Sequence, residues 1–319
     1  MGKLSATLPD FGLSYPPQKW KARRPGHGYY TFEVEDYATF IHEIAPLFTD
    51  TKYEFVWRGA RNPDWKLQSS LSRRLASLKL KGLDWQRGVS EITIQHVLDF
   101  IIQLRGLNIL KAEHDEIYHF LLGHVGRKYH TFLTVLKLMT AEQLHLTNEL
   151  FALGQHYGLA TPFLDWTTVP LIALFFAFHE PDEPGKSADG VGARVVYALN
   201  RTVVEEDWPP NEAHGPDSIL FLGSLAYDNP RIVGQAGLFT FVPAHLPVDE
   251  WVVTHFKHSE KRPVLLRFLI RNKNRNDCLA ALNRMNLNGR TIYPDREGAA
   301  IHGNYLLERS IKNASPATP

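Results

Sequence analysis

The apolar residues of this chain follow two kinds of pattern. Runs rich in aromatic, β-branched and other apolar residues, which are typical of strands, occur at residues 29–35, 53–60, 193–200, 237–242 and 262–270. Spacings of three and four residues, which are typical of amphipathic helices, occur at 36–48, in two or three segments between about 85 and 152, and at 274–287. Residues 289–312 predict a short strand, a turn and a final helix. We expect residues 201–228 to be irregular.

Residues 155–178 change character twice, from a polar loop through an extended segment to an apolar helix. Asp165, Thr167 or Thr168 is predicted to be the helix N-cap, because short polar side chains accept hydrogen bonds from a first turn and Pro170 suits the first helical position. Residues 171–178 are apolar on every face. This pattern predicts a helix that is covered on all sides.

The order of these elements predicts an α+β fold with a mostly antiparallel sheet and a large helical insertion at about 85–152. The glycine fingerprints of dinucleotide-binding and phosphate-binding loops do not occur in the sequence. We expect an extended arm at 1–27, a single domain at 28–312 and a disordered tail at 313–319.

Composition narrows the class of protein. Apolar residues make up 44% of the 319 residues, which is enough for a substantial core, and the net charge of +1 favours neither nucleic acid nor a membrane surface as a partner. Cys278 is the only cysteine, so an internal disulfide is excluded. The longest apolar run is far shorter than a membrane-spanning helix. We therefore expect a cytoplasmic protein.

Two clusters of polar residues have both a functional and an ordinary interpretation. The histidines at 114, 119, 124 and 130 are spaced by five, five and six residues and share no helical face, so we expect no metal site. A basic cluster could follow a phosphate backbone, although a solvated helix face is the simpler interpretation; it comprises Arg61, Lys66, Arg73, Arg74, Lys79 and Lys81.

Five short blocks of sequence resemble the FRG domain, a family named for an (F/Y)RG tripeptide. In chain order they are Trp57-Arg58-Gly59, Leu67-Gln68-Ser69-Ser70-Leu71, residues 155–159 with 164–167, residues 231–239, and Tyr293-Pro294-Asp295. The first block has Trp where the family has Phe or Tyr. The resemblance extends over residues 30–310.

A second resemblance, to the Arg-Ser-Glu class of ADP-ribosyltransferases, implies an ADP-ribosyltransferase-like fold with NAD as the substrate. By position, Arg58 matches the arginine that holds NAD, Thr167 or Thr168 the hydroxyl of the Ser-Thr-Ser strand, and Glu297 the catalytic glutamate, with Asp295 two residues before it. The chain departs from that pattern, since Asp165-Trp166-Thr167 is not Ser-Thr-Ser. The resemblance implies ADP-ribosyl transfer or NAD hydrolysis, with an unknown protein or nucleic-acid acceptor, and suggests a toxin or phage-defence effector.

The chemistry can be stated without the family. A carboxylate such as Glu297 would stabilise an oxocarbenium-like state at the ribose. Arg58 would bind phosphate, Gly59 would allow close approach of a ligand, and Tyr157 or Trp166 would stack on nicotinamide. His156 is a candidate base. The remaining predicted cofactor-binding residues are Asp165, Thr168, Gln235 and Asp295.

Each of these residues also has a structural interpretation. Arg58 would pair with Asp165 or Asp295, Trp166 would lie in the core, and Glu297 would be the acidic first turn of the last helix. His156 would be a hydrogen-bonded loop residue. Two further functions therefore stay open, namely a non-catalytic nucleotide-sensing module and a protein that binds a partner through the helical insertion.

Overall fold

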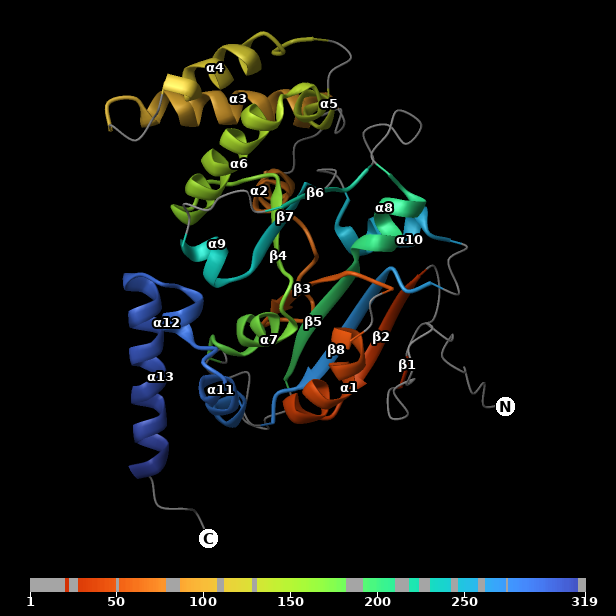
Figure 1. Ribbon diagram of the computed structural model, residues 1–319, viewed down its shortest axis with the longest axis vertical. Coiled ribbons are helices and arrows are strands. Elements are labelled where there is room, and N and C mark those ends of the chain that lie inside the picture. Colours follow the sequence, from red (N-terminus) through yellow and green to blue (C-terminus); the bar gives the residue numbers. More distant parts are fainter. Residues whose placement is uncertain are drawn as a thin grey trace.

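The computed structural model describes most of the chain, and it is built around one large sheet (Figure 1). The described residues are 21–22, 28–49, 52–78, 87–107, 112–127, 131–181, 192–209, 218–223, 230–241, 246–257, 262–273 and 275–314. The predicted arm at 1–27 lies outside them apart from Lys21 and Ala22, and so do residues 315–319 of the predicted tail.

The sheet has eight strands in the order β1-β2-β8-β5-β3-β4-β7-β6. The strands are β1 (Lys21–Ala22), β2 (Tyr29–Val34), β3 (Phe55–Ala60), β4 (Phe163–Thr167), β5 (Ala193–Asn200), β6 (Leu220–Leu222), β7 (Gly237–Phe241) and β8 (Leu265–Arg271). Only β2 and β8 run parallel, and every other pairing among these strands is antiparallel. The prediction of an α+β fold with a mostly antiparallel sheet is confirmed.

Helices α1 (Tyr37–Thr49) and α7 (Pro170–Phe178) cover one face of the sheet. Phe40 of α1 packs edge-on against Phe268 of β8, with ring centroids 5.4 Å apart. A Cβ atom on Gly59 of β3 would lie 1.8 Å from the carbonyl oxygen of Ala173 in α7, so only glycine allows this strand and helix to pack so closely. Helix α7 is buried along almost its whole length, as its composition predicts.

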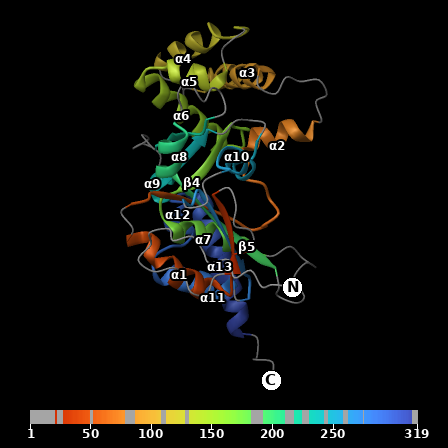
Figure 2. The same ribbon diagram turned by 90° about the vertical axis from the view of Figure 1, so that its right-hand side faces the viewer.

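The helical insertion forms one end of the elongated molecule (Figure 2). It contains α3 (Arg87–Leu104), α4 (Ala112–Leu122), α5 (Phe132–Leu138) and α6 (Ala141–His156), so the described residues hold four helices where the sequence predicts two or three. Their apolar side chains form a second core that continues onto Phe163, Phe239 and Phe241 of the sheet. The insertion is therefore packed on β4 and β7.

The remaining helices are short apart from the last one. They are α2 (Ser70–Ser77), α8 (Arg201–Asp207), α9 (Pro230–Gly234), α10 (Val248–His255), α11 (Arg275–Arg284), α12 (Gly289–Ile292) and α13 (Arg296–Ala314). No helix formed by the described residues is both long and apolar enough to cross a membrane.

Three local predictions are wrong. The N-cap of α7 is Val169, which has no side-chain cap, because Asp165 and Thr167 belong to β4. Residues 289–292 form a helix because the side chains of Asn288 and Thr291 close a capping box. The segment expected to be irregular contains α8, which is capped by Asn200, and the three-residue strand β6.

Candidate ligand-binding site

A cavity of about 350 Å3 lies where the sheet divides between β3 and β4. These strands share a single paired position, Trp57 with Thr167, so they diverge beyond it. The ends of β3 and β4, together with parts of α6, α7 and α9, line the opening. A split in a sheet is a natural place for a ligand, because the unpaired strand ends leave backbone and side chains facing one space.

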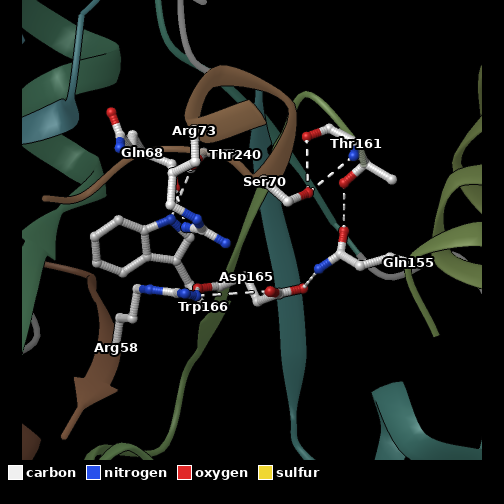
Figure 3. Close-up of polar contacts among 9 residues, drawn as sticks. All are labelled: Arg58, Gln68, Ser70, Arg73, Gln155, Thr161, Asp165, Trp166 and Thr240. Atoms are coloured by element: carbon white, nitrogen blue, oxygen red, sulfur yellow. Dashed lines mark hydrogen bonds and ion pairs between the residues drawn. The ribbon is translucent and has the colours of Figure 1, made fainter. Parts of the chain in front are cut away.

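Arg58 and Asp165 join the two strands at this split. Arg58 Nη1 donates to the carbonyl oxygen of Asp165 at 2.6 Å and lies 3.6 Å from its carboxylate. Gln155 Nε2 donates to the other carboxylate oxygen of Asp165 at 2.5 Å. Figure 3 shows this carboxylate between the Arg58 guanidinium and the Gln155 amide. The side chain of Asp165 stays 48% exposed, so it is held in place and still accessible.

The network continues from Gln155 into the body of the protein. The buried hydroxyl of Thr161 donates to Gln155 Oε1 at 2.6 Å, and the backbone N–H of Thr161 donates to Ser70 Oγ at 2.9 Å. Gln155 itself lies in the last turn of α6, and the chain turns away two residues after the helix at Gly158, which has a φ of 87°. Residues far apart in the sequence therefore fix the Asp165 carboxylate.

Two more arginines contribute to the lining. Arg61 pairs with Glu180 at 3.1 Å and lies over the ring of Trp65 at 5.5 Å. Arg231 of α9 pairs with Asp295 and with Glu297 Oε2, the latter at 2.7 Å, and lies 5.2 Å from the ring centroid of Tyr293. The hydrogen bond from Arg231 holds the pKa of Asp295 below its ordinary value.

Two partly buried aromatic groups, His179 and Tyr293, border the same space. Burial lowers the pKa of His179, so its ring is neutral at pH 7. Burial also raises the pKa of Tyr293, so its phenol stays protonated and can donate a hydrogen bond. The cavity thus combines three guanidinium groups, two carboxylates and several aromatic rings.

A comparison with known protein families supports the resemblance to the FRG domain. Residues 53–186 match the model of the FRG domain family. The chain carries an FRG domain. The matched segment supplies Arg58, Gln155, Asp165 and Glu180, whereas Arg231 and Tyr293 come from outside it. Neither the curated proteins nor the solved structures include a match to this chain.

Several predicted site residues line the cavity of this FRG domain protein. They are Arg58, Gly59, His156, Asp165, Trp166, Thr167 and Gln235. The others, Tyr157, Thr168, Asp295 and Glu297, do not line it. Tyr157 is 76% exposed just beyond the end of α6, and the hydroxyl of Thr168 contacts only the Ala236 carbonyl among the described residues, at 3.4 Å.

The three predicted catalytic residues do not meet around one space. Thr167 is buried, and its hydroxyl donates to the Gln235 carbonyl at 2.7 Å and accepts from Val169 N at 3.0 Å, so it closes the turn into α7. Glu297 is in the first turn of α13 and contacts Arg231 from outside the cavity. Glu297 therefore occupies the acidic first turn of the last helix, which was the structural interpretation of this residue.

Two of the predicted ligand contacts, Trp166 and Gly59, also have a structural role, and a third, His156, lies in a helix. Trp166 is 3% exposed, and its indole N–H donates to Thr240 Oγ1 at 2.9 Å, so the indole lies in the core. The Cβ side of Gly59 faces α7, so its lack of a side chain serves packing. His156 is the last residue of α6 rather than a loop residue.

Sequence reasoning missed other lining residues. Arg61, Trp65, His179, Glu180, Arg231 and Tyr293 line the cavity but were not predicted as site residues. Arg231 and Tyr293 belong to the fourth and fifth blocks that resemble the FRG domain. Their place in these blocks could have identified them as site residues.

The basic cluster and the histidines show mostly ordinary contacts. Lys66 pairs with Glu250 at 2.8 Å and Arg73 donates to the Gln68 carbonyl, while Lys79 and Lys81 lie outside the described residues. His124 contacts the Phe120 carbonyl, and His130 lies outside the described residues. In the part of the chain that the structure describes, no three His, Cys, Asp or Glu side chains gather as metal ligands would.

Proposed function

We propose that the cavity at the split of the sheet binds NAD and that the protein is an ADP-ribosyltransferase-like enzyme, which transfers ADP-ribose or hydrolyses NAD. The observation that supports this proposal is the meeting of Arg58, Arg61 and Arg231 with the exposed carboxylate of Asp165 in one cavity. Guanidinium groups bind phosphate through paired hydrogen bonds, and a fixed carboxylate suits a ribose that develops positive charge.

The three arginines differ in how readily they could accept a phosphate. Arg231 already contacts two carboxylates, whereas Arg61 pairs with Glu180 in the cavity lining at 3.1 Å. Arg58 is 25% exposed and lies 3.6 Å from the Asp165 carboxylate, so this ion pair is loose. Arg58 and Arg61 are therefore the proposed phosphate ligands.

The size of the cavity limits how much of the ligand it encloses. A volume of about 350 Å3 is at the lower end of the range for ligand sites. This space suits one nucleotide-sized half of NAD. The nicotinamide riboside half is the one that must be enclosed, because its glycosidic bond has to approach the carboxylate and exclude bulk water.

In the proposed reaction the bond between C1′ of the ribose and the nicotinamide nitrogen breaks, and nicotinamide leaves as a neutral molecule. A water or an acceptor group forms the new bond to C1′ and loses a proton. Asp165 would stabilise the oxocarbenium-like state, because Gln155 holds its carboxylate in place inside the cavity. The proposal therefore assigns to Asp165 the role that the family resemblance gave to Glu297.

The test is titration of NAD into the purified protein, followed by measurement of nicotinamide release. We expect Arg58→Ala to weaken NAD binding and Asp165→Asn to retain binding but lose release. Glu297→Gln is the matched control, since it also removes one carboxylate and lies outside the cavity; it should retain both. Loss of release in Glu297→Gln with full release in Asp165→Asn would overturn the assignment to Asp165.

The two remaining functions have distinct outcomes in the same experiment. Binding without release in the wild type would indicate a nucleotide-sensing module. Absence of binding would favour a protein partner on the helical insertion, where Leu107, Leu122 and Leu138 are exposed. A toxin or phage-defence role predicts that expression harms the host only when Asp165 is intact.

A further inference from the structure

One tryptophan of the cavity lining differs from the other tryptophans in its exposure. Trp57, Trp166 and Trp251 are buried, whereas Trp65 is 49% exposed and is the one exposed tryptophan among the residues that the structure describes. Because Trp65 lines the cavity and is also half exposed to solvent, it lies at the rim. An indole in this position offers a flat surface on which a ring of a ligand can stack.

The backbone around Trp65 is fixed to the body of the protein. The Trp65 N–H donates to the carbonyl oxygen of Asn62 at 3.2 Å, and the Asp64 N–H donates to Asn62 Oδ1 at 2.8 Å. Arg267 of β8 donates to the carbonyl oxygen of Pro63 at 2.6 Å, which ties this turn to the sheet. The indole is therefore carried by an anchored turn, so a ligand does not have to order this segment when it binds.

The polar groups of the cavity follow one another in an order that matches the parts of NAD. The Asp165 carboxylate lies 3.6 Å from Arg58. Arg61 follows Arg58 by three residues, and its guanidinium lies 5.5 Å from the centroid of the Trp65 ring. In NAD the ribose that carries nicotinamide is followed by two phosphates, a second ribose and adenine. With the first ribose at Asp165 and the phosphates at the two arginines, the adenine comes to Trp65.

The size of the cavity supports the same arrangement. A volume of about 350 Å3 suits one half of NAD, and the proposed function assigns this space to the nicotinamide riboside, so the adenine has to lie outside it. Stacking on an aromatic side chain stabilises a base without enclosing it. Arg61 lies over the same indole, so its guanidinium can hold the neighbouring phosphate while the base stacks.

We propose that Trp65 is the platform on which the adenine of NAD stacks. It would also be the residue by which this site selects a ligand that contains adenine over nicotinamide mononucleotide. This inference rests on the proposed function, because the order of groups has meaning only if NAD occupies the cavity.

The test compares two ligands that each contain part of NAD. ADP-ribose carries the adenine and has no bond to nicotinamide that the protein could break, whereas nicotinamide mononucleotide lacks the adenine. We expect calorimetry to show that the wild type prefers ADP-ribose and that this preference falls by at least about tenfold in Trp65→Ala, through weaker binding of ADP-ribose alone. An equal loss of affinity for both ligands, or a loss for nicotinamide mononucleotide alone, would overturn the assignment of adenine to Trp65.

The kind of side chain at position 65 separates stacking from a structural role. Trp65→Phe keeps an aromatic ring and should retain most of the affinity for ADP-ribose, whereas Trp65→Leu keeps apolar bulk without a ring and should bind as weakly as Trp65→Ala. Equal binding by the phenylalanine and leucine variants would refute stacking. Tyr157→Ala is the matched control, since Tyr157 is also an exposed aromatic residue but does not line the cavity; it should bind both ligands as the wild type does.

Failure of this inference and failure of the proposed function give different results. A wild type that releases nicotinamide from NAD, together with an unchanged ligand preference in Trp65→Ala, would overturn the role of Trp65 alone. A wild type that binds neither NAD nor ADP-ribose nor nicotinamide mononucleotide would overturn both. Weaker binding of ADP-ribose in Trp65→Ala, without nicotinamide release by the wild type, would support the platform and reject the reaction.

Discussion

Arg58 Nη1 contacts both the carbonyl oxygen and the carboxylate of Asp165, at 2.6 and 3.6 Å. One guanidinium therefore joins β3 to β4 immediately after their only paired position. The contact replaces the ladder hydrogen bonds that the diverging strands no longer make. It also places a cation and a carboxylate at the entrance to the split, so the same pair serves the fold and the proposed chemistry.

Arg58→Ala should lower the free energy of unfolding by about 1–2 kcal/mol. The hydrogen bond from the charged group to the Asp165 carbonyl accounts for most of this loss, because a half-exposed ion pair contributes little. Urea denaturation measures the change. Arg58→Lys keeps the charge and one donor, so it should recover part of the stability; a lysine variant as unstable as the alanine variant would argue against the carbonyl contact.

Gln155→Ala should cost about 1–3 kcal/mol of stability, because it leaves the fully buried Thr161 hydroxyl without its acceptor. Gln95→Ala is a matched control, since Gln95 also donates from Nε2 to a carboxylate, that of Asp99 at 2.8 Å, but on an exposed helix face. The control should change stability by less than about 0.5 kcal/mol. Equal losses in the two variants would show that the buried network does not contribute.

The fold was predictable where the sequence contains a clear strand-like or helical run of apolar residues. Strands β2, β3, β5, β7 and β8 and helix α7 agree with such runs in their sequences. The three-residue strand β6 is too short to show a period. Helix α12 contains Thr291 and Ile292, which favour strands. The capping box formed by Asn288 and Thr291 stabilises the helix instead.

The site was predictable only in part, because spacing along the chain does not show which side chains share a partner. The sequence allows Arg58 to pair with either Asp165 or Asp295. The structure shows Asp165 as the partner, because the register of β3 and β4 places these two residues side by side. Arg231 takes Asp295 and Glu297 instead, and no pattern in α9 predicts that contact. The core position of Trp166 follows from the general burial of large aromatic residues.

Gly59→Ala should destabilise the protein by about 1–3 kcal/mol or more, because the new Cβ would clash with the backbone of α7 at Ala173 and Ala177. Thermal unfolding measures the loss. Gly303→Ala in α13 is the control and should stabilise the protein. A Cβ there meets nothing within 4 Å, and alanine favours a helix by about 0.5–1 kcal/mol relative to glycine. A tolerated alanine at position 59 would contradict the close packing of β3 on α7.

The stability of the protein should fall as the pH is lowered below about 6.5, and His179 should cause part of that fall. Burial lowers the pKa of His179 by more than the neighbouring Glu180 raises it, and Arg275 adds to the lowering. The unfolded chain therefore takes up a proton at the ordinary histidine pKa of about 6.5, while the folded protein does so only at lower pH. Between these two values the unfolded state binds more protons, so the free energy of unfolding decreases with falling pH.

His179→Phe separates this effect from the other titrating groups, because it keeps an aromatic ring stacked on Phe175, where the centroids are now 5.2 Å apart. The measurement is the free energy of unfolding of both proteins from pH 8 to pH 5. The difference between wild type and variant should be constant above about pH 7 and should shift against the wild type below about pH 6.5. Parallel profiles over the whole range would show that His179 titrates alike in the folded and unfolded states, whereas a shift in favour of the wild type at low pH would mean that its pKa is raised.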